Sequence, residues 1–305
     1  MGTAIAQPRF VFYRMDLTGR SVVWDPSMLN SRCKPILICI VVNVFAAVAC
    51  SQDIPAEPQL PDRKEWLAQR ALEFASYRFE IEGAGRKLLT FEPKPVLDWS
   101  NPERNTFFGV TFVWTREGRP ELIGSAYGRG RSLRHEFHSL STEPIVAERS
   151  GNRVHRFQPG IEWRELAGAP EPAASSASRL TQMRRQAERF EMTMIFRRPV
   201  ESHHPLRLLT RPAYPLPGTA VNEVALFLFV QGTDPECVLL LEAKSDKTWR
   251  YAFARQNEGS LQANLDGKQV LDMPPHWPLP GSGLPPPGSE SAYITVTPPE
   301  AKAAP

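Results

Sequence analysis

The sequence of 305 residues is poor in cysteine: it has four, and only Cys237 lies beyond residue 50. The body of the protein therefore cannot contain a disulfide framework. Cys237 directly precedes an aliphatic run, Val238 to Leu241. We predict that its thiol is buried and inert, and not a catalytic nucleophile.

The body also lacks an excess of either charge. Of the 36 basic and 33 acidic side chains, five basic and two acidic ones lie in residues 1–50, which leaves 31 of each sign for the rest. A nucleic-acid-binding domain ordinarily keeps a basic face that displaces counterions from phosphates. Only local patches such as Arg129, Arg131 and Arg134 remain, so we expect no nucleic-acid partner.

Catalytic signatures are missing as well. The sequence has no Gly-x-Ser-x-Gly elbow, no phosphate-binding Gly-Lys-Ser/Thr loop, no His-Glu-x-x-His helix and no dinucleotide-binding fingerprint. It has no internal repeat of the kind that builds solenoids or propellers. We therefore expect no cofactor, and the sequence assigns no catalytic residue.

The histidines do not predict a metal site. His135 and His138 lie on a predicted strand, where side chains three positions apart face opposite sides and cannot share one metal ion. His203 and His204 lie beside prolines in a predicted loop, with Glu201 as the one further ligand type nearby. We predict no metal ligands.

The longest apolar run is short for a membrane span. Residues Pro35 to Cys50 are apolar except for Asn43, and they follow Arg32 and Lys34. A spanning helix needs about 20 apolar residues, whereas this length suits the apolar core of a signal peptide. A buried core helix or a membrane anchor is the alternative. The small residues Ala47-Val48-Ala49 then form a signal-peptidase site.

Met28 begins an ordinary charged segment ahead of the apolar run. We therefore predict a signal peptide over 28–49 and interpret 1–27 as an N-terminal extension from a misassigned start codon. Residues Ala47 to Cys50 resemble the lipobox of bacterial lipoproteins, although Ala47 stands where that motif usually has Leu. The resemblance implies a lipid on Cys50; otherwise the ordinary signal peptidase removes the leader. The chain is expected to be exported, as a periplasmic, extracellular or lipid-anchored envelope protein.

The body is predicted to be a single domain over 62–275, preceded by a tether over 50–61 and followed by a disordered Pro-rich tail over 276–305. Ten of the 30 prolines lie at or after Pro274, which favours an extended tail. We predict an α+β fold: a predominantly antiparallel β-sheet, as a sandwich or open barrel, with two packing helices.

The expected elements follow from capping signals and periodicity. Asp62 with Glu65 three residues later predicts a helix over 63–75. A second helix has Leu180, Met183, Ala187, Phe190 and Met194 on one face. The continuous aliphatic runs 224–230 and 238–241 predict central strands covered on both faces. Alternating patterns predict further strands at 77–82, 108–114, 122–127, 133–140, 145–149, 153–157, 161–166 and 249–253.

A few polar residues are candidates for ligand contact. Asp98 beside Trp99 suggests a loop with an aromatic platform for a sugar, and Glu136 and Trp163 are a further carboxylate and aromatic. The segment Asp234-Pro235-Glu236 follows Gly232-Thr233 between two predicted strands, so we assign its residues to a turn.

Two functions remain open. The first is a non-catalytic binding or interaction module of the cell envelope, whose partner is an envelope protein or polymer and which meets the membrane only through its leader or a lipid on Cys50. The alternative is an extracytoplasmic hydrolase of polysaccharide or peptide. Two carboxyl groups within about 5 to 10 Å across one cleft would favour the hydrolase. Burial of Trp99 and Trp163 without a cleft would reject it.

Export is directly testable. We expect fractionated cells to hold the protein outside the cytoplasm, with a mature N-terminus at Cys50, lipidated or free, and no peptide from residues 1–27 in mass spectra of cell extracts. An uncut chain dissolved in the cytosol, with residues 36–48 packed inside its globular part, would contradict the signal-peptide prediction.

Overall fold

The computed structural model describes residues 13–15, 21–23, 62–83, 85, 87–129, 132–196, 201–215, 223–276 and 290–298. It divides into two compact units, Met1–Pro58 and Gln59–Pro305. In the first unit, β1 (Tyr13–Met15) pairs antiparallel with β2 (Ser21–Val23). The predicted signal peptide over 28–49, Cys50 and the tether up to residue 61 lie outside the described residues.

The second unit begins with α1 (Arg63–Ala75), where it was expected. The Asp62 side chain accepts a hydrogen bond from the Glu65 backbone N–H at 3.0 Å, so it caps the helix as its sequence position suggests. The helix leads into β3 (Tyr77–Ile81), whose alternate side chains are buried. In a four-stranded sheet, β3 lies between β4 (Lys87–Leu88) and β10 (Ile145–Arg149), and β11 (Asn152–Phe157) pairs with β10.

A six-stranded sheet forms the centre of this unit. The long strands β7 (Thr106–Arg116) and β8 (Arg119–Arg129) form the expected hairpin, closed by Glu117 and Gly118 at φ of 54° and 82°. These left-handed conformations match the twist that two-residue hairpin turns require. The other strands are β5 (Thr90–Phe91), β6 (Leu97–Asn101), β9 (Ser132–Ser139) and β20 (Tyr293–Val296).

Strand β20 corrects the prediction of a disordered tail over 276–305. Residues Tyr293 to Val296 pair antiparallel with β9, from Tyr293 opposite His138 to Val296 opposite His135. The prediction was based on the number of prolines in the segment. It overlooked the short stretch Tyr-Ile-Thr-Val, whose β-branched and aromatic residues have strong strand propensity. Residues 277–289 and 299–305 lie outside the described residues.

An eight-stranded sheet follows in space, and α2 (Ser176–Ala187) packs against its β14, β15 and β16. The aliphatic runs form neighbouring strands inside this sheet, as expected. Its strand order is β12 (Arg164–Glu165), β17 (Trp249–Arg255), β16 (Asp234–Ala243), β15 (Glu223–Gln231), β14 (Ser202–Pro215), β13 (Phe190–Phe196), β18 (Ser260–Leu265) and β19 (Lys268–Met273).

Three sequence predictions are wrong in detail. The second helix ends at Ala187, and Phe190 and Met194 belong to β13. Phe190 and Met194 fit a helical period, but together with Met192 they also fit the alternation of a strand. The segment forms a strand because it pairs with β14 and β18 on its two sides. His203 and His204 lie in β14 and not in a loop. The strand expected over 161–166 is reduced to Arg164–Glu165.

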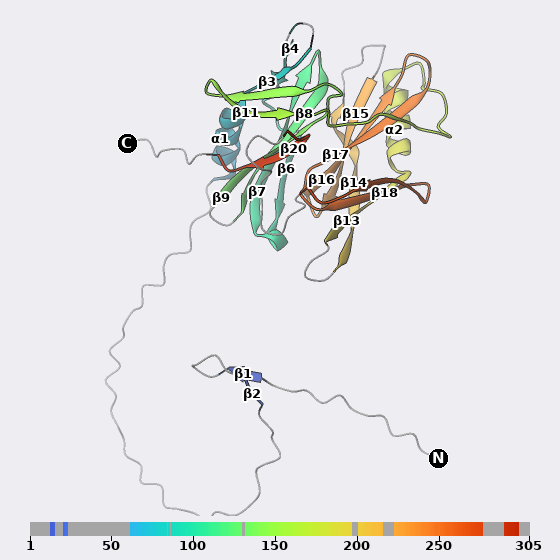
Figure 1. Ribbon diagram of the computed structural model, residues 1–305. Helices are drawn as coiled ribbons and strands as arrows, with labels where there is room; N and C mark the ends of the chain where they lie inside the picture. Colours follow the sequence, from blue (N-terminus) through green and yellow to red (C-terminus); the bar gives the residue numbers. More distant parts are fainter. Residues whose placement is uncertain are drawn as a thin grey trace, which may run out of the picture. The chain divides into compact units, whose positions relative to one another are not determined.

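The apolar side chains form three layers because alternate residues of a strand face opposite sides. Phe112 and Trp114 of β7 pack with α1, whereas Val113 faces the eight-stranded sheet. On β15, Leu226 and Leu228 face the six-stranded sheet, and the alternate residues Ala225, Phe227 and Phe229 pack toward α2. Figure 1 shows α1 and α2 on opposite outer sides of these sheets.

The predicted α+β, predominantly antiparallel fold with two packing helices is therefore confirmed for the described residues. Neither of those helices combines the length and the apolar character needed to cross a bilayer.

The buried His138 makes the stability of this fold depend on pH. Burial lowers the pKa of His138 to about 3, and its ring is hydrogen bonded to the Gly160 carbonyl at 3.1 Å. An unfolded histidine titrates near about 6.5. Because the folded-state pKa is lower, the unfolded state binds the extra proton, and stability present at pH 7 is lost as the pH falls below about 6.5.

We predict that His138 alone accounts for a loss of about 3 kcal/mol in unfolding free energy between pH 7 and pH 4. Denaturant unfolding of the wild type and of His138→Gln, whose amide can keep a donor toward Gly160, measures this loss as a pH-dependent difference between the two proteins. A difference that stays constant with pH would contradict the burial of a neutral imidazole.

Candidate functional site

A cavity of about 410 Å³ lies where the six-stranded and eight-stranded sheets meet. Its walls come from both sheets and from the loop after β17, so residues far apart in the sequence converge on it. The lining residues are Trp99, Glu103, Arg104, Thr106, Tyr127, Glu136, Phe196, His204, Gln231, Asp234, Gln256, Asn257, Glu258 and Tyr293.

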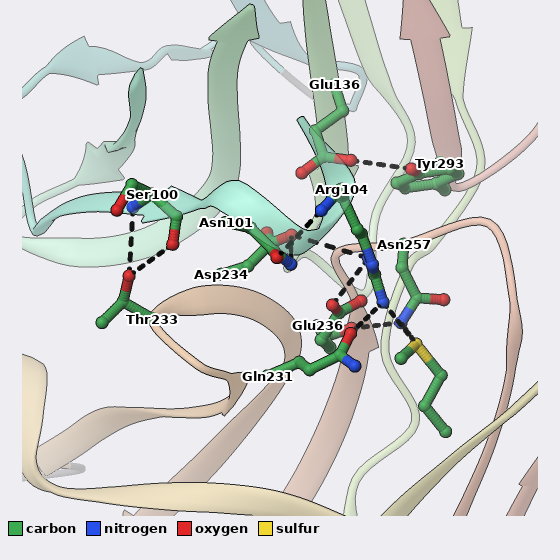
Figure 2. Close-up of polar contacts among 11 residues, drawn as sticks. Ser100, Asn101, Arg104, Glu136, Gln231, Thr233, Asp234, Glu236, Asn257 and Tyr293 are labelled. Carbon is green, nitrogen blue, oxygen red and sulfur yellow. Dashed lines mark hydrogen bonds and ion pairs between the residues drawn. The ribbon is translucent and has the colours of Figure 1, made fainter. Parts of the chain in front are cut away.

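Arg104 is placed by a short 3₁₀ helix, η2 (Pro102–Arg104), between β6 and β7. The Asn101 side chain caps this turn by accepting a hydrogen bond from the Arg104 backbone N–H at 3.3 Å. Asn105 ends it in the left-handed conformation, with φ of 57°. The chain thereby leaves the six-stranded sheet for one turn, and the Arg104 side chain reaches toward the other sheet (Figure 2).

The Arg104 guanidinium bridges two carboxyl groups of β16. Its Nη1 atom lies 2.8 Å from Glu236 Oε1 and 3.5 Å from Asp234 Oδ2. Its Nη2 atom donates to Gln231 Oε1 and contacts Met194 Sδ at 3.4 Å. Figure 2 shows these contacts converging on one side chain.

The β15–β16 hairpin brings these carboxyl groups to the arginine. Its turn is Gly232-Thr233, and β16 begins at Asp234, so the assignment of Asp234 and Glu236 to a turn is wrong. The Thr233 hydroxyl accepts from the Ser100 N–H at 3.0 Å and donates to the Ser100 carbonyl at 2.7 Å, which fixes the hairpin tip to β6.

Burial shifts the protonation of this carboxyl pair. Desolvation raises the pKa of Asp234 to about 6, although hydrogen bonding from Asn101 and the charge of Arg104 oppose the shift. Desolvation and the negative charge of Asp234 raise the pKa of Glu236 to about 8. Near pH 7 the pair therefore carries about one negative charge, which the Arg104 cation balances.

Glu136 is a third buried carboxyl group, on the opposite wall. It is 3% exposed, and its Oε2 accepts a hydrogen bond from the Tyr293 hydroxyl at 2.8 Å. Desolvation raises the pKa of Glu136 well above its usual value, and the charges of Asp234, Glu236 and Glu258 raise it further, whereas the bond from Tyr293 opposes this. These surroundings favour the protonated form of Glu136.

A second row of hydrogen bonds joins the sheets beside the cavity. Trp99 Nε1 donates to Thr111 Oγ1 at 3.1 Å, Thr111 and Ser125 share a hydrogen bond of 2.9 Å, and Ser125 Oγ donates to Gln256 Oε1 at 3.2 Å. The Trp99 ring packs directly on Gly109, where an added Cβ would lie 2.3 Å from it. This contact requires glycine, and it holds the indole in the cavity wall.

The sequence candidates separate into two groups. Trp99 and Glu136 both line the cavity. Asp98 is exposed and forms an ion pair with Arg63 at 2.5 Å. Trp163 lies at a separate pocket of about 290 Å³, with the guanidinium groups of Arg119 and Arg250 over its ring.

Sequence reasoning missed Arg104, Asp234, Glu236 and Tyr293 as members of one site. One usable signal was present: two acidic residues at alternate positions lead directly into the aliphatic run of β16. On a strand they share a face, and the run predicts that this face is buried. Nothing local marked Arg104, because the carboxyl groups that it pairs with, Asp234 and Glu236, lie more than a hundred residues away.

The described residues contain no group of three or more His, Cys, Asp or Glu side chains arranged to hold a metal ion. His135 and His138 face opposite sides of β9, as predicted: His135 Nε2 lies 3.2 Å from Glu73 Oε2 of α1, whereas the His138 ring is hydrogen bonded to the Gly160 carbonyl. Cys237 is fully buried, and burial raises the pKa of its thiol. The prediction of a buried thiol is confirmed.

Arg104 should stabilise the protein mainly above neutral pH. In Arg104→Met, we expect a loss of about 3 kcal/mol in unfolding free energy at pH 8, because a buried carboxyl group loses its counterion. The loss should shrink at pH 6, where protonation removes the charge.

Glu236→Gln in the Arg104→Met background is the matched control, since it removes the orphaned charge and should restore much of the stability at pH 8. Urea unfolding of the wild type, both single variants and the double variant measures the coupling. Equal losses at both pH values, or no rescue by Glu236→Gln, would contradict the bridge.

No family model, no curated protein and no solved structure matches this chain. The ligand class of the cavity has to be inferred from its lining residues, their charges and their exposure.

Proposed function

We propose that this protein is an exported, non-catalytic binding module of the cell envelope, and that its ligand occupies the cavity between the two sheets. The observation that carries the proposal is a cavity of about 410 Å³ where buried polar groups and aromatic rings from both sheets converge. Export is proposed on the apolar run and small residues before Cys50. The ligand would come from an envelope polymer or protein, or from a small molecule outside the cytoplasm.

The cavity has the size and composition of a ligand site. Pockets for small molecules usually span about 300–1,000 Å³ and combine aromatic walls with a few polar groups that fix orientation. Here Trp99, Tyr127, Phe196 and Tyr293 supply the rings. The polar groups come from η2, β9, β15, β16 and the loop after β17.

Part of this polar lining has unused hydrogen-bonding capacity. Asn257 is 8% exposed, and its Oδ1 atom has no hydrogen-bond partner among the described residues. Its amide nitrogen is already used, donating to the Glu236 carbonyl at 3.1 Å. Buried polar atoms are nearly always satisfied in folded proteins, so an orphaned acceptor beside a cavity is explained by a bound ligand or water.

The cavity is also held in one shape before any ligand arrives. The Arg104 bridge, the Ser100–Thr233 hydrogen bonds and the bond from Ser125 to Gln256 each join the two sheets around it. A preorganised site loses little conformational entropy on binding, which favours affinity.

A hydrolase is the second candidate, and the carboxyl pair is the observation that favours it. Because Asp234 and Glu236 contact the same nitrogen of Arg104, at 3.5 and 2.8 Å, their oxygens lie within roughly 6 Å of each other, as in retaining glycosidases. However, both come from one strand and face one guanidinium. Glu236 is also fully buried and is not a lining residue, so a substrate bond cannot lie between the two groups. Binding is therefore the better-supported function.

One experiment separates the two functions. The purified domain is mixed with a panel of small metabolites, saccharides and short peptides, and binding is detected as an increase in melting temperature. Each compound that binds is then incubated with the protein for a long time, recovered, and its molecular mass is measured by mass spectrometry. We expect a subset to bind, about 2.7 kcal/mol of stabilisation at a hundredfold excess over Kd, and full recovery of the intact compound.

Products whose masses sum to that of the compound plus one water per cleaved bond, and which are absent with Asp234→Asn, would establish the hydrolase instead. Glu65→Gln, an exposed change on α1, is the matched control for that variant. Binding that persists unchanged when the cavity rim is filled by Glu103→Trp would place the ligand elsewhere and contradict the proposed site.

A further inference from the structure

The charges in the cavity wall are mostly negative. The described lining contains four carboxyl groups, from Glu103, Glu136, Asp234 and Glu258, and they come from η2, β9, β16 and the loop after β17. Arg104 is the one arginine in that lining, which has no lysine, and His204 is the remaining side chain there that can become positive.

Arg104 already contacts protein groups, although its side chain is 28% exposed. Its Nη1 atom faces Asp234 and Glu236, its Nη2 atom contacts Gln231 and Met194, and the guanidinium lies 5.4 Å over the Phe196 ring. The positive charge is therefore consumed inside the protein. An anionic ligand would meet carboxyl groups without a free cation to bind it.

Glu136 is the group whose surroundings call for a positive partner. Its side chain is nearly fully buried, it lines the cavity, and Tyr293 contacts one of its two oxygens. Among the described residues, the second oxygen has no hydrogen-bond donor and the carboxyl group has no ion pair; Figure 2 shows this oxygen pointing away from Tyr293. A buried carboxylate is costly without a counterion, and here the protein supplies none at bonding distance.

The rings around Glu136 suit a cation as well. Tyr127, Trp99 and Tyr293 line the same cavity, and the centroids of the Trp99 and Tyr127 rings are 5.8 Å apart. Aromatic faces attract ammonium groups through their electron-rich surface, most strongly where water is excluded. A carboxylate with aromatic neighbours recognises an amine by both charge and shape.

We propose that the ligand is a small organic cation whose primary ammonium group binds between Glu136 and the Tyr127 and Tyr293 rings. This inference rests on the proposed binding function and names its ligand class. The ammonium donates to the second oxygen of Glu136, and the rest of the ligand extends toward the polar groups of β16 and the loop after β17.

Proton linkage follows from this arrangement. The buried surroundings raise the pKa of Glu136 in the ligand-free protein. An ammonium group beside the carboxyl group stabilises its charged form, so binding favours release of the proton and tightens as the pH rises. Arg255 is not paired with Glu136. Its guanidinium lies 6.0 Å from the Tyr293 ring centroid and donates to the Pro274 carbonyl, and Arg255 is not a lining residue of the cavity. The other titratable groups that interact with Glu136 are Asp234, Glu236, Glu258, Tyr127 and Tyr293, and the charge of Arg134 acts on Tyr127.

The test uses probes that differ in charge and hardly in shape. Putrescine, 1,4-butanediol and succinate share a four-carbon chain that ends in amines, hydroxyls or carboxylates, and glucosamine and glucose form a second matched pair. Isothermal titration calorimetry of the protein at low salt should detect putrescine or glucosamine. The neutral and anionic counterparts should bind at least about tenfold more weakly.

Two variants locate the ammonium group. Glu136→Gln keeps the size of the side chain and an acceptor for Tyr293, and it should weaken amine binding by about tenfold and reduce the rise in affinity with pH, of which the Asp234 and Glu236 pair leaves a part. Glu103→Gln at the exposed rim keeps the fold and should weaken binding by about twofold at low salt only. Glu65→Gln on α1 should change neither.

The outcomes distinguish this inference from the proposed function. Glucose or butanediol binding as tightly as its amine, succinate binding best, or amine binding unaffected by Glu136→Gln would overturn the cation and leave the binding function standing. If the calorimeter detects none of these probes and no compound of the wider panel shifts the melting temperature, both are overturned.

Discussion

The contact between Arg104 and the carboxyl groups of β16 is the constraint on which the rest of this structure depends. Arg104 comes from one turn of 3₁₀ helix in the six-stranded sheet, and Asp234 and Glu236 begin a strand of the eight-stranded sheet. The apolar layer between these sheets is non-directional and would tolerate some sliding. An ion pair at 2.8 Å, with Asn101 donating to Asp234 at 3.0 Å, fixes one relative position and thereby the shape of the adjacent cavity.

The same contact determines the charge that the cavity offers. One arginine balances one negative charge, and Asp234 and Glu236 together take up that arginine by sharing a proton near neutral pH. Glu136, on the other wall, is left with a hydrogen bond from Tyr293 and no cation. Acidic, partly protonated and aromatic-lined, the cavity is suited to bind a positively charged group. Binding, and not bond cleavage, is therefore the function that we propose for it.

Much of the fold could be predicted from local signals, whereas the site could not. The cap at Asp62, the turn at Glu117-Gly118 and the aliphatic runs of β15 and β16 are encoded within a few residues of the structure that they form. The site forms by convergence of residues up to about 200 positions apart, which no spacing rule reveals. Tyr293 illustrates the difference: it lies in a Pro-rich segment, and its role exists only because β20 pairs with β9. Glu136 was a candidate because a carboxyl on a strand stands out, but its partner was not foreseeable.

The central claim is that this cavity holds more buried carboxyl groups than its arginine can neutralise. Carbon-13 NMR of the glutamate and aspartate side chains, titrated in the ligand-free protein, tests it most directly. The account predicts that the pKa of Glu136 lies well above its usual value and that Asp234 and Glu236 titrate as a coupled pair on either side of pH 7, near about 6 and 8. If all three carboxyl groups lose their protons near about pH 4 to 4.5, as exposed side chains do, the claim is wrong.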